Sequence, residues 1–354
     1  MRVSGRCGLG LSILLWSASA LAQQAATQQP AAPVQAAGAE TGVVLDVVVS
    51  PKNGGAPVAG LTQQDFTVTD NKEPQKITSF RAMGGSSAPV AVVLVIDDVN
   101  TNYTTIGYAR QEIDKFFKAN DGKLPFLTQV AIVTDTGTQI QNGFTKDGNQ
   151  LAGLLDTYVV GLRAINRSAG FYGATDRLDK SLDALHQLTS YLGRLPGRKL
   201  LLWVSPGWPI LTGPNVQLSL KQQQNIFDSV VQTSTFLREA RVTVYSIDPL
   251  GTADAATFHN FYYESFLKGL RKPSQANLGN LALQVIATQS GGRVLNTSND
   301  MAGLLKQAVD DGDAYYELSF DPVKGEPNEY HQIEVTVAKP GLVARTRTGY
   351  YSGN

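Results

Sequence analysis

The stretch that decides the fold is Ala91-Val-Val-Leu-Val-Ile-Asp97-Asp98-Val-Asn-Thr101. Its apolar residues follow one another without alternation, which is typical of a strand covered on both faces in the middle of a parallel sheet. Carboxylate, amide and hydroxyl side chains come directly after the apolar run. Because ligands of such sheets gather where the strands end, this loop is the first candidate site.

From residue 88 to residue 312 the sequence alternates buried strands with amphipathic helices. Apolar residues recur at helical spacing near Ile106–Lys118 and Asp176–Leu192. Lys199–Val204 and Val242–Ile247 are further strands. This alternation predicts an α/β fold with a doubly wound, mostly parallel sheet and helices on both faces.

Small β segments flank this region at residues 42–87 and 313–354. Apolar runs between turn residues predict the strands Val43–Val49, Asp65–Thr69 and Ile77–Phe80 in the first segment and Tyr315–Phe320, His331–Val337 and Ala344–Thr348 in the second. The two segments are placed to pair with each other across the α/β region.

The first 22 residues have the pattern of a secretory signal: Arg2 and Arg6, the apolar stretch Leu9–Trp16, then Ala20-Leu-Ala22. A membrane anchor is the alternative, but the apolar stretch is shorter than the roughly 20 residues that span a bilayer. Residues 23–41, rich in Ala, Gln and Pro, predict an extended linker. We therefore expect a secreted or periplasmic protein.

Composition narrows the class of function. Among 354 residues the only cysteine, Cys7, lies inside the signal, so the exported chain has no disulfide. Without Arg2 and Arg6 the chain has 30 − 2 = 28 basic and 30 acidic side chains, a net charge of about −2. This balance argues against a nucleic-acid partner. No later segment predicts a membrane span after signal cleavage.

Several short motifs occur in order along the chain: Gly60-Leu-Thr-Gln-Gln-Asp-Phe66, the Asp97 loop, Gly173-Ala-Thr175, Arg198-Lys-Leu-Leu-Leu-Trp-Val-Ser205, Gln289-Ser-Gly-Gly292 and Arg347-Thr-Gly-Tyr350. With the strand and helix alternation between them, they resemble the von Willebrand factor A family. The narrower resemblance is to its secreted bacterial VWFA-related variant of acidobacterial type. It covers most of the chain after residue 41.

The resemblance implies a metal-ion-dependent adhesion site for Mg²⁺ or Ca²⁺. In the family an Asp-x-Ser-x-Ser loop, a Thr from a second loop and an Asp from a third supply oxygen ligands. Asp97, Thr101 and Thr175 match this pattern, but Val99 replaces the first serine and Pro206 the second aspartate. The implied site is therefore degenerate.

Two interpretations of this loop stay open. Asp98, Asn100 or Asp176 can turn inward and supply the missing oxygens. Alternatively the loop holds no ion, Asp97 is structural, and Asn100 or Thr101 is the N-cap of the next helix.

The loops after the strands also predict a partner surface. We expect Asp98, Asn100, an exposed Trp208, and the insert residues Phe258, Phe261 and Tyr262 to contact a protein partner. For the insert Phe258–Phe266 the alternative is a short helix that packs its rings inward.

Enzyme motifs are missing from the chain. His186, His259 and His331 are scattered, and neither a Gly-x-Ser-x-Gly elbow nor a Gly-x-x-x-x-Gly-Lys phosphate loop occurs. The sequence predicts a secreted, non-catalytic protein-interaction module of adhesion type. A metal-independent scaffold of an envelope complex is the alternative, and a hydrolase is a third.

Overall fold

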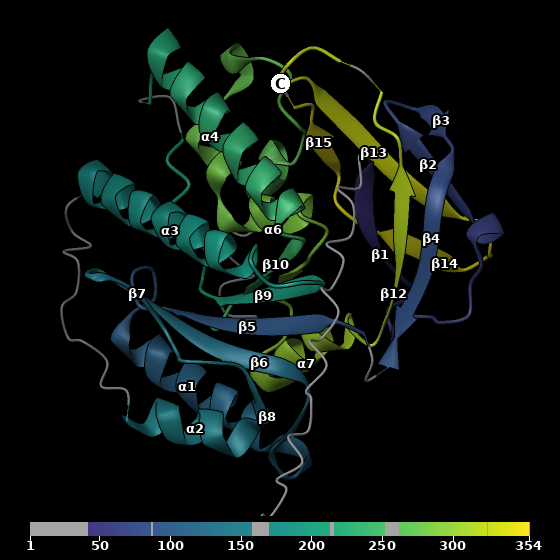
Figure 1. Ribbon diagram of the computed structural model, residues 1–354. Helices are drawn as coiled ribbons and strands as arrows, with labels where there is room; N and C mark the ends of the chain where they lie inside the picture. The colour runs from purple at the N-terminus through teal and green to yellow at the C-terminus, as the bar shows by residue number, and fades with distance from the viewer. Residues whose placement is uncertain are drawn as a thin grey trace, which may run out of the picture. The chain divides into compact units, whose positions relative to one another are not determined.

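The structure is a computed structural model that describes residues 42–85, 88–157, 170–212, 216–251, 262–323 and 325–353 (Figure 1). The predicted signal, the predicted linker, Phe258 and Phe261 lie outside the described residues.

The central element is β5 (Val90–Asp97), which pairs in parallel with β6 (Lys123–Thr134) on one side and β9 (Arg198–Val204) on the other. The seven-stranded sheet has the order β11-β10-β9-β5-β6-β7, and β8 pairs with β6. Its other strands are β7 (Gly137–Ile140), β8 (Thr145–Asp147), β10 (Val242–Ile247) and β11 (Val294–Leu295). Only β7 and β8 run antiparallel to their neighbour in this described sheet.

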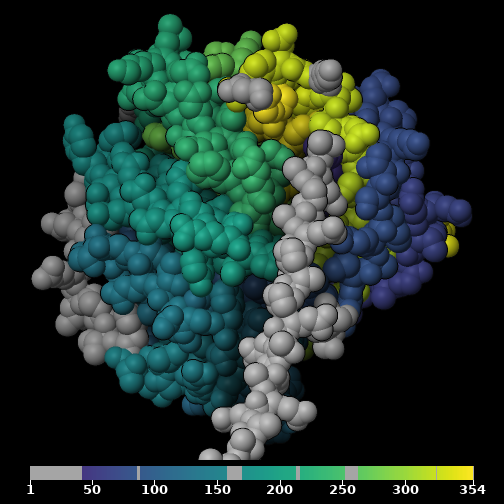
Figure 2. Space-filling model, in the orientation of Figure 1, coloured from purple at the N-terminus to yellow at the C-terminus, as the bar shows by residue number. Residues whose placement is uncertain are grey.

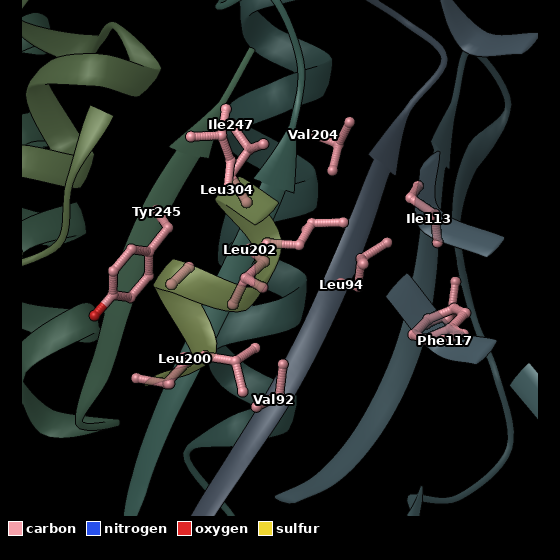
Figure 3. Packing of buried hydrophobic residues seen from close by; sticks show 14 of the residues in the cluster. Val92, Leu94, Ile113, Phe117, Leu200, Leu202, Val204, Tyr245, Ile247 and Leu304 are labelled. Carbon is pink, nitrogen blue, oxygen red and sulfur yellow. The ribbon is translucent and has the colours of Figure 1, made fainter. Parts of the chain in front are cut away.

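Helices cover both faces of this sheet. Successive residues of β5 point to opposite faces, and both sets are apolar, so both faces need a cover. Val92, Leu94 and Ile96 share one apolar cluster with α1 and α7, whereas Val93 and Val95 share another with α3, α4 and α6. Figure 3 shows the first cluster, where Leu94 and Leu202 meet Ile113 and Leu304. The helices are α1 (Tyr103–Lys118), α2 (Gly148–Thr157), α3 (Gly170–Leu192), α4 (Leu220–Glu239), α6 (Leu283–Gln289) and α7 (Met301–Asp310). The predicted doubly wound α/β fold is confirmed.

Short 3₁₀ turns complete the described helical elements: η1 (Gln63–Asp65), η3 (Ala119–Gly122), η5 (Tyr262–Phe266), η6 (Pro273–Gln275) and η7 (Leu278–Leu281). No helix in the described part of the chain is both long and apolar enough to cross a bilayer.

The two flanking β segments form a sandwich of two four-stranded sheets, β14-β1-β12-β4 and β15-β13-β2-β3. Each sheet combines strands from both ends of the chain, since β1 pairs with β12 and β2 with β13. Their apolar faces enclose one cluster that includes Leu45, Phe66 and Leu318. The bounds are β1 (Val43–Pro51), β2 (Phe66–Asp70), β3 (Glu73–Gln75), β4 (Ile77–Gly84), β12 (Ala314–Phe320), β13 (Tyr330–Val337), β14 (Leu342–Arg345) and β15 (Gly349–Tyr351).

The sandwich covers the edge at which the parallel strands begin. Arg241, just before β10, forms ion pairs with Asp46 of β1 and Glu317 of β12. Arg198, the first residue of β9, stacks over the Tyr315 ring with its guanidinium carbon 4.9 Å from the ring centroid. The edge at which the strands end, where Asp97 lies, is therefore on the side away from the sandwich (Figure 1).

Asp311 joins the two parts through a buried charge network. Its side chain is 3% exposed and accepts a hydrogen bond from Tyr245 Oη at 2.7 Å. Arg293 donates to the same carboxylate at 3.1 Å, and Arg345 of β14 forms a second ion pair with it. Buried charges are tolerated when paired in this way.

We expect Asp311→Ala to lower the free energy of unfolding by about 3–5 kcal/mol, because Arg345 and Tyr245 would lose their buried acceptor. Asp310→Ala is the matched control, since Asp310 pairs only with the exposed Lys306 at 2.7 Å. That change should cost less than about 1 kcal/mol. Urea unfolding of both variants measures the difference, and equal losses would contradict the role given to Asp311.

Candidate functional site

Asp97 ends β5 at the point where the sheet order reverses. The chain passes from β5 to β6 on one side and later crosses to β9 on the other. Ligands of open α/β sheets bind in the crevice at such a point. The Asp97 loop therefore occupies the position where this fold class has its binding site.

The Asp97 carboxylate is 0% exposed and accepts three hydrogen bonds. Oδ1 accepts from the Asn100 backbone N–H at 2.9 Å, and Oδ2 accepts from Asn100 Nδ2 at 2.9 Å. Trp203 Nε1, from the neighbouring strand β9, also donates to Oδ2 at 2.9 Å. Both oxygens thus have N–H partners, as a buried carboxylate requires.

Asn100 connects this loop to helix α3. Its Nδ2 donates to Ser181 Oγ at 2.8 Å as well as to Asp97. Ser181 Oγ in turn donates to the carbonyl oxygen of Arg177, one turn earlier in α3, at 2.8 Å. Asn100 therefore holds the end of β5 against α3.

Apolar side chains fill the space beside Asp97. Val99 and Trp208 are each 3% exposed, and both belong to the apolar cluster that contains Trp203. The Trp203 and Trp208 rings meet edge to face, with centroids 5.0 Å apart and an interplanar angle of 77°. The expectation that Trp208 is exposed is therefore wrong: its ring packs onto Trp203 and has no surface to offer a partner.

The remaining positions of the implied ion site are Thr175, Thr101 and Pro206. Thr175 lies within α3, where its hydroxyl donates to the Phe171 carbonyl oxygen at 3.0 Å. Thr101 is 4% exposed, and its Oγ1 has no hydrogen-bond partner. Pro206 supplies no ligand, and the preceding Ser205 Oγ accepts from Gly207 N–H at 3.2 Å.

This arrangement does not fit Mg²⁺ or Ca²⁺. Both ions need several oxygen ligands, usually including carboxylates, with lone pairs free for the metal. Three of the four lone-pair positions of the Asp97 carboxylate face N–H groups, and Val99 contributes only hydrocarbon. The buried Asn100 Oδ1 and Thr101 Oγ1 have no hydrogen-bond partner, but a neutral amide and a hydroxyl add no second carboxylate. Within the described ranges no group of three or more His, Cys, Asp or Glu side chains is placed to hold a metal ion.

The N-cap of α1 differs from the prediction. Asn102, rather than Asn100 or Thr101, accepts a hydrogen bond from the Thr105 N–H at 2.8 Å. Asn100 is engaged with Asp97 and so is not available for the helix. The half-buried Asp98 is the first residue of the turn after β5, and its backbone N–H donates to the Val133 carbonyl oxygen at 2.9 Å.

Of the predicted aromatic insert, the structure describes Tyr262, which is 46% exposed and lies in η5. Its ring meets that of Phe266 with centroids 5.8 Å apart. Tyr262 is thus partly available at the surface.

Four exposed apolar side chains near the starts of helices escaped the sequence analysis. Tyr103 begins α1 and is 67% exposed, Phe171 and Tyr172 are in the first turn of α3 at 49% and 84%, and Leu220 begins α4 at 82%. We call Tyr103, Phe171, Tyr172 and Leu220 the edge residues. Spacing alone gave no signal for Phe171 and Leu220, since each lies seven residues before a buried residue of its helix, Leu178 and Phe227.

The edge residues lie on the side of the sheet where Asp97 is. α1 follows β5 directly, and α3 and α4 lead into the beginnings of β9 and β10, so all three helices start at the opposite edge from the sandwich (Figure 1). Lys180 Nζ of α3 donates to the Asp135 carbonyl oxygen after β6 at 3.2 Å, which confirms this placement for α3.

No protein-family model and no curated protein sequence matches the chain. Similar solved structures include proximal thread matrix protein 1 from the mussel byssus, with 10% identity, a TM-score of 0.35, and coverage of 75% of this chain and 50% of that one. The chain thus spans about half the length of the mussel protein.

Two other similar structures are smaller. The VWA domain of SpRpn10 has 11% identity and a TM-score of 0.31, covering 67% of this chain and 100% of that domain. The manganese-loaded TRAP protein of Plasmodium vivax has 12% identity and a TM-score of 0.32, covering 77% of this chain and 98% of that one.

We expect Asp97→Asn to lower the free energy of unfolding by about 1.5–3 kcal/mol, because an amide NH₂ would face the Trp203 or Asn100 donors. Asp135→Asn is the control, since the half-buried Asp135 carboxylate has no hydrogen bond to any described residue. Urea unfolding, followed by tryptophan fluorescence, measures both.

The same experiment tests the ion site. Millimolar Mg²⁺, Mn²⁺ or Ca²⁺ should leave the unfolding midpoint of the wild type unchanged. Stabilisation of the wild type, but not of Asp97→Asn, by any of these ions would contradict the structural role of Asp97.

Proposed function

We propose that the protein is a secreted, non-catalytic protein-interaction module whose recognition does not depend on a metal ion. One observation carries this proposal. The two oxygens of the Asp97 carboxylate accept three hydrogen bonds from N–H groups, and Val99 and Trp208 fill the crevice beside them. An adhesion site of the family type would require those oxygens for the ion.

The filled crevice also argues against catalysis at the usual place in this fold. The histidines that the structure describes are engaged elsewhere. His331 Nδ1 lies 3.0 Å from Asp70 in the sandwich, and His186 Nε2 lies 3.0 Å from Thr233 Oγ1 between α3 and α4. Neither histidine is near the edge where the parallel strands end.

The edge residues are the surface that supports partner binding best. Large exposed apolar side chains on a soluble domain often mark protein contacts, and aromatic residues supply most hot spots. The Phe171 and Tyr172 rings meet edge to face, with centroids 6.1 Å apart, and form a two-ring anchor. Tyr262 is a further candidate contact.

Export rests on the signal pattern of residues 1–22, and the partner class rests on the balanced charge, which disfavours nucleic acid. The narrower assignment to secreted bacterial VWFA-related proteins rests on the motifs quoted above. A structural scaffold is the second candidate, because the Asp311 network fixes the sandwich to the α/β core.

We expect the double variant Phe171→Ser, Tyr172→Ser to bind less partner protein from an envelope extract, because aromatic anchors dominate such contacts. The amount bound should fall by ~10-fold or more relative to the wild type. Leu154→Ser with Val343→Ser is the matched control, since these apolar residues are 41% and 38% exposed on α2 and β14. Quantified pull-down with the full exported chain measures retention.

The same pull-down with and without EDTA distinguishes metal-independent from metal-dependent binding. Retention that is unchanged by EDTA and lost in the double variant agrees with metal-independent recognition at this edge. Retention that EDTA abolishes would contradict it, and retention that neither treatment alters would favour the scaffold.

A further inference from the structure

A hollow lies between α4 and the η7–α6 segment, on the opposite face of the sheet from α1. It has about 340 Å³ of space, its open mouth included. Apolar walls come from Val230, Leu237, Leu281 and Ile286, and polar groups from Ser234 and Arg347, among others. Arg347 is the only charged residue in this lining.

Close backbone packing brings Arg347 to this place. It lies between β14 and β15, and the Thr348 N–H donates to the Gln289 carbonyl oxygen at 3.1 Å. A Cβ at Gly291, whose φ is +91°, would approach Arg347 N to 2.7 Å, so a glycine is needed for this contact. Figure 1 shows β15 beside α4 and α6, and Figure 2 shows yellow sandwich atoms against the green atoms of α4.

The Arg347 side chain is buried without a partner. The residue is 8% exposed, and its guanidinium makes no hydrogen bond and no ion pair with the described residues, so its nitrogens reach only the small open mouth of the hollow. The other buried arginines differ: Arg198 donates to the Asp311 carbonyl oxygen at 2.8 Å, and Arg345 pairs with the Asp311 carboxylate. The nearby Asp46 is held by Arg241.

Burial is the main effect on the charge of Arg347. Burial, followed by the positive charge of Arg238, lowers the pKa of Arg347 to about 10, against the opposing effects of Asp46 and Tyr330. The group still carries its charge at neutral pH. A charge with so little hydration and no partner is unfavourable, and an anion in the hollow would supply hydrogen-bond acceptors and offset the repulsion by Arg238.

We propose that this hollow binds a short-chain monocarboxylate, with the carboxylate on Arg347 and the hydrocarbon against the walls of α4 and α6. The guanidinium fork matches a carboxylate in two parallel hydrogen bonds. The half-buried Ser234 hydroxyl makes no hydrogen bond within the described chain and is a further donor.

The other polar groups around the hollow are already engaged. Asn280 Nδ2 donates to the Phe266 carbonyl oxygen at 3.3 Å, and Ser290 Oγ donates to the Ala287 carbonyl oxygen at 2.9 Å. One cationic group facing apolar walls fits a singly charged amphiphile better than sulfate or phosphate, which need several donors. This site lies apart from the edge residues and is independent of the proposed function.

Isothermal titration of the full exported chain at neutral pH and low salt tests the proposal with butyrate, its neutral amide butyramide, and sulfate. We expect butyrate to bind and the other two not to. Arg347→Met keeps the side-chain bulk and should weaken butyrate binding by roughly 10- to 100-fold, because hydrogen bonds to charged groups contribute about 1.5–3 kcal/mol. Ser234→Leu leaves the Arg347 charge in place but narrows the hollow, so this variant should not bind butyrate.

Thermal unfolding separates this result from misfolding. Without added anion, Arg347→Met should unfold at the same or a higher temperature than the wild type, whereas Arg345→Met, which leaves Asp311 underpaired, should unfold at a lower one. Equal binding of butyramide, undiminished butyrate binding to Arg347→Met, binding of sulfate in preference to butyrate, or no butyrate binding by the wild type would each overturn the proposal.

Discussion

The burial of one carboxylate organises the end of the central sheet. Asp97 follows an unbroken apolar strand, so its charge lies in the interior and has to be compensated by hydrogen bonds. Trp203 supplies one donor from the next strand, and Asn100 supplies two from the loop while bonding Ser181 of α3. Once Trp203 is fixed in this way, Trp208 and Val99 pack beside it and fill the crevice. A position that usually receives a ligand is thereby part of the core.

A second set of buried charges fixes the sandwich to the α/β core. Asp311 gathers Tyr245, Arg293 and Arg345, which come from three strands or their ends. The motifs Gln289-Ser-Gly-Gly292 and Arg347-Thr-Gly-Tyr350 lie together at this junction, where Gly291 admits the backbone of Arg347. These motifs therefore shape the contact between the two layers, and Arg347 makes no ion pair with the described residues there.

Much of the fold followed from local pattern. The unbroken apolar strand at Ala91–Ile96 predicted the central strand, and the 3.6-residue stripe from Ile106 to Phe117 predicted α1. Both patterns arise because residues close together in the sequence are buried on the same face, so their spacing shows the type of element directly. The site was predicted less well. Asp97 was located correctly at a strand end, but the burial of Trp208 and the position of Thr175 inside α3 depend on contacts between distant segments.

The sequence by itself determined the order of strands and helices and the departures at Val99 and Pro206 from the ion-site pattern, because these depend only on residue type and spacing. The tertiary structure decided which groups donate to the Asp97 carboxylate, which apolar residues stay exposed and which charges find partners. Those outcomes depend on pairs such as Trp203 with Asp97, 106 residues apart. Hydrogen bonding and desolvation act between neighbours in space, and sequence separation does not reveal which residues those are.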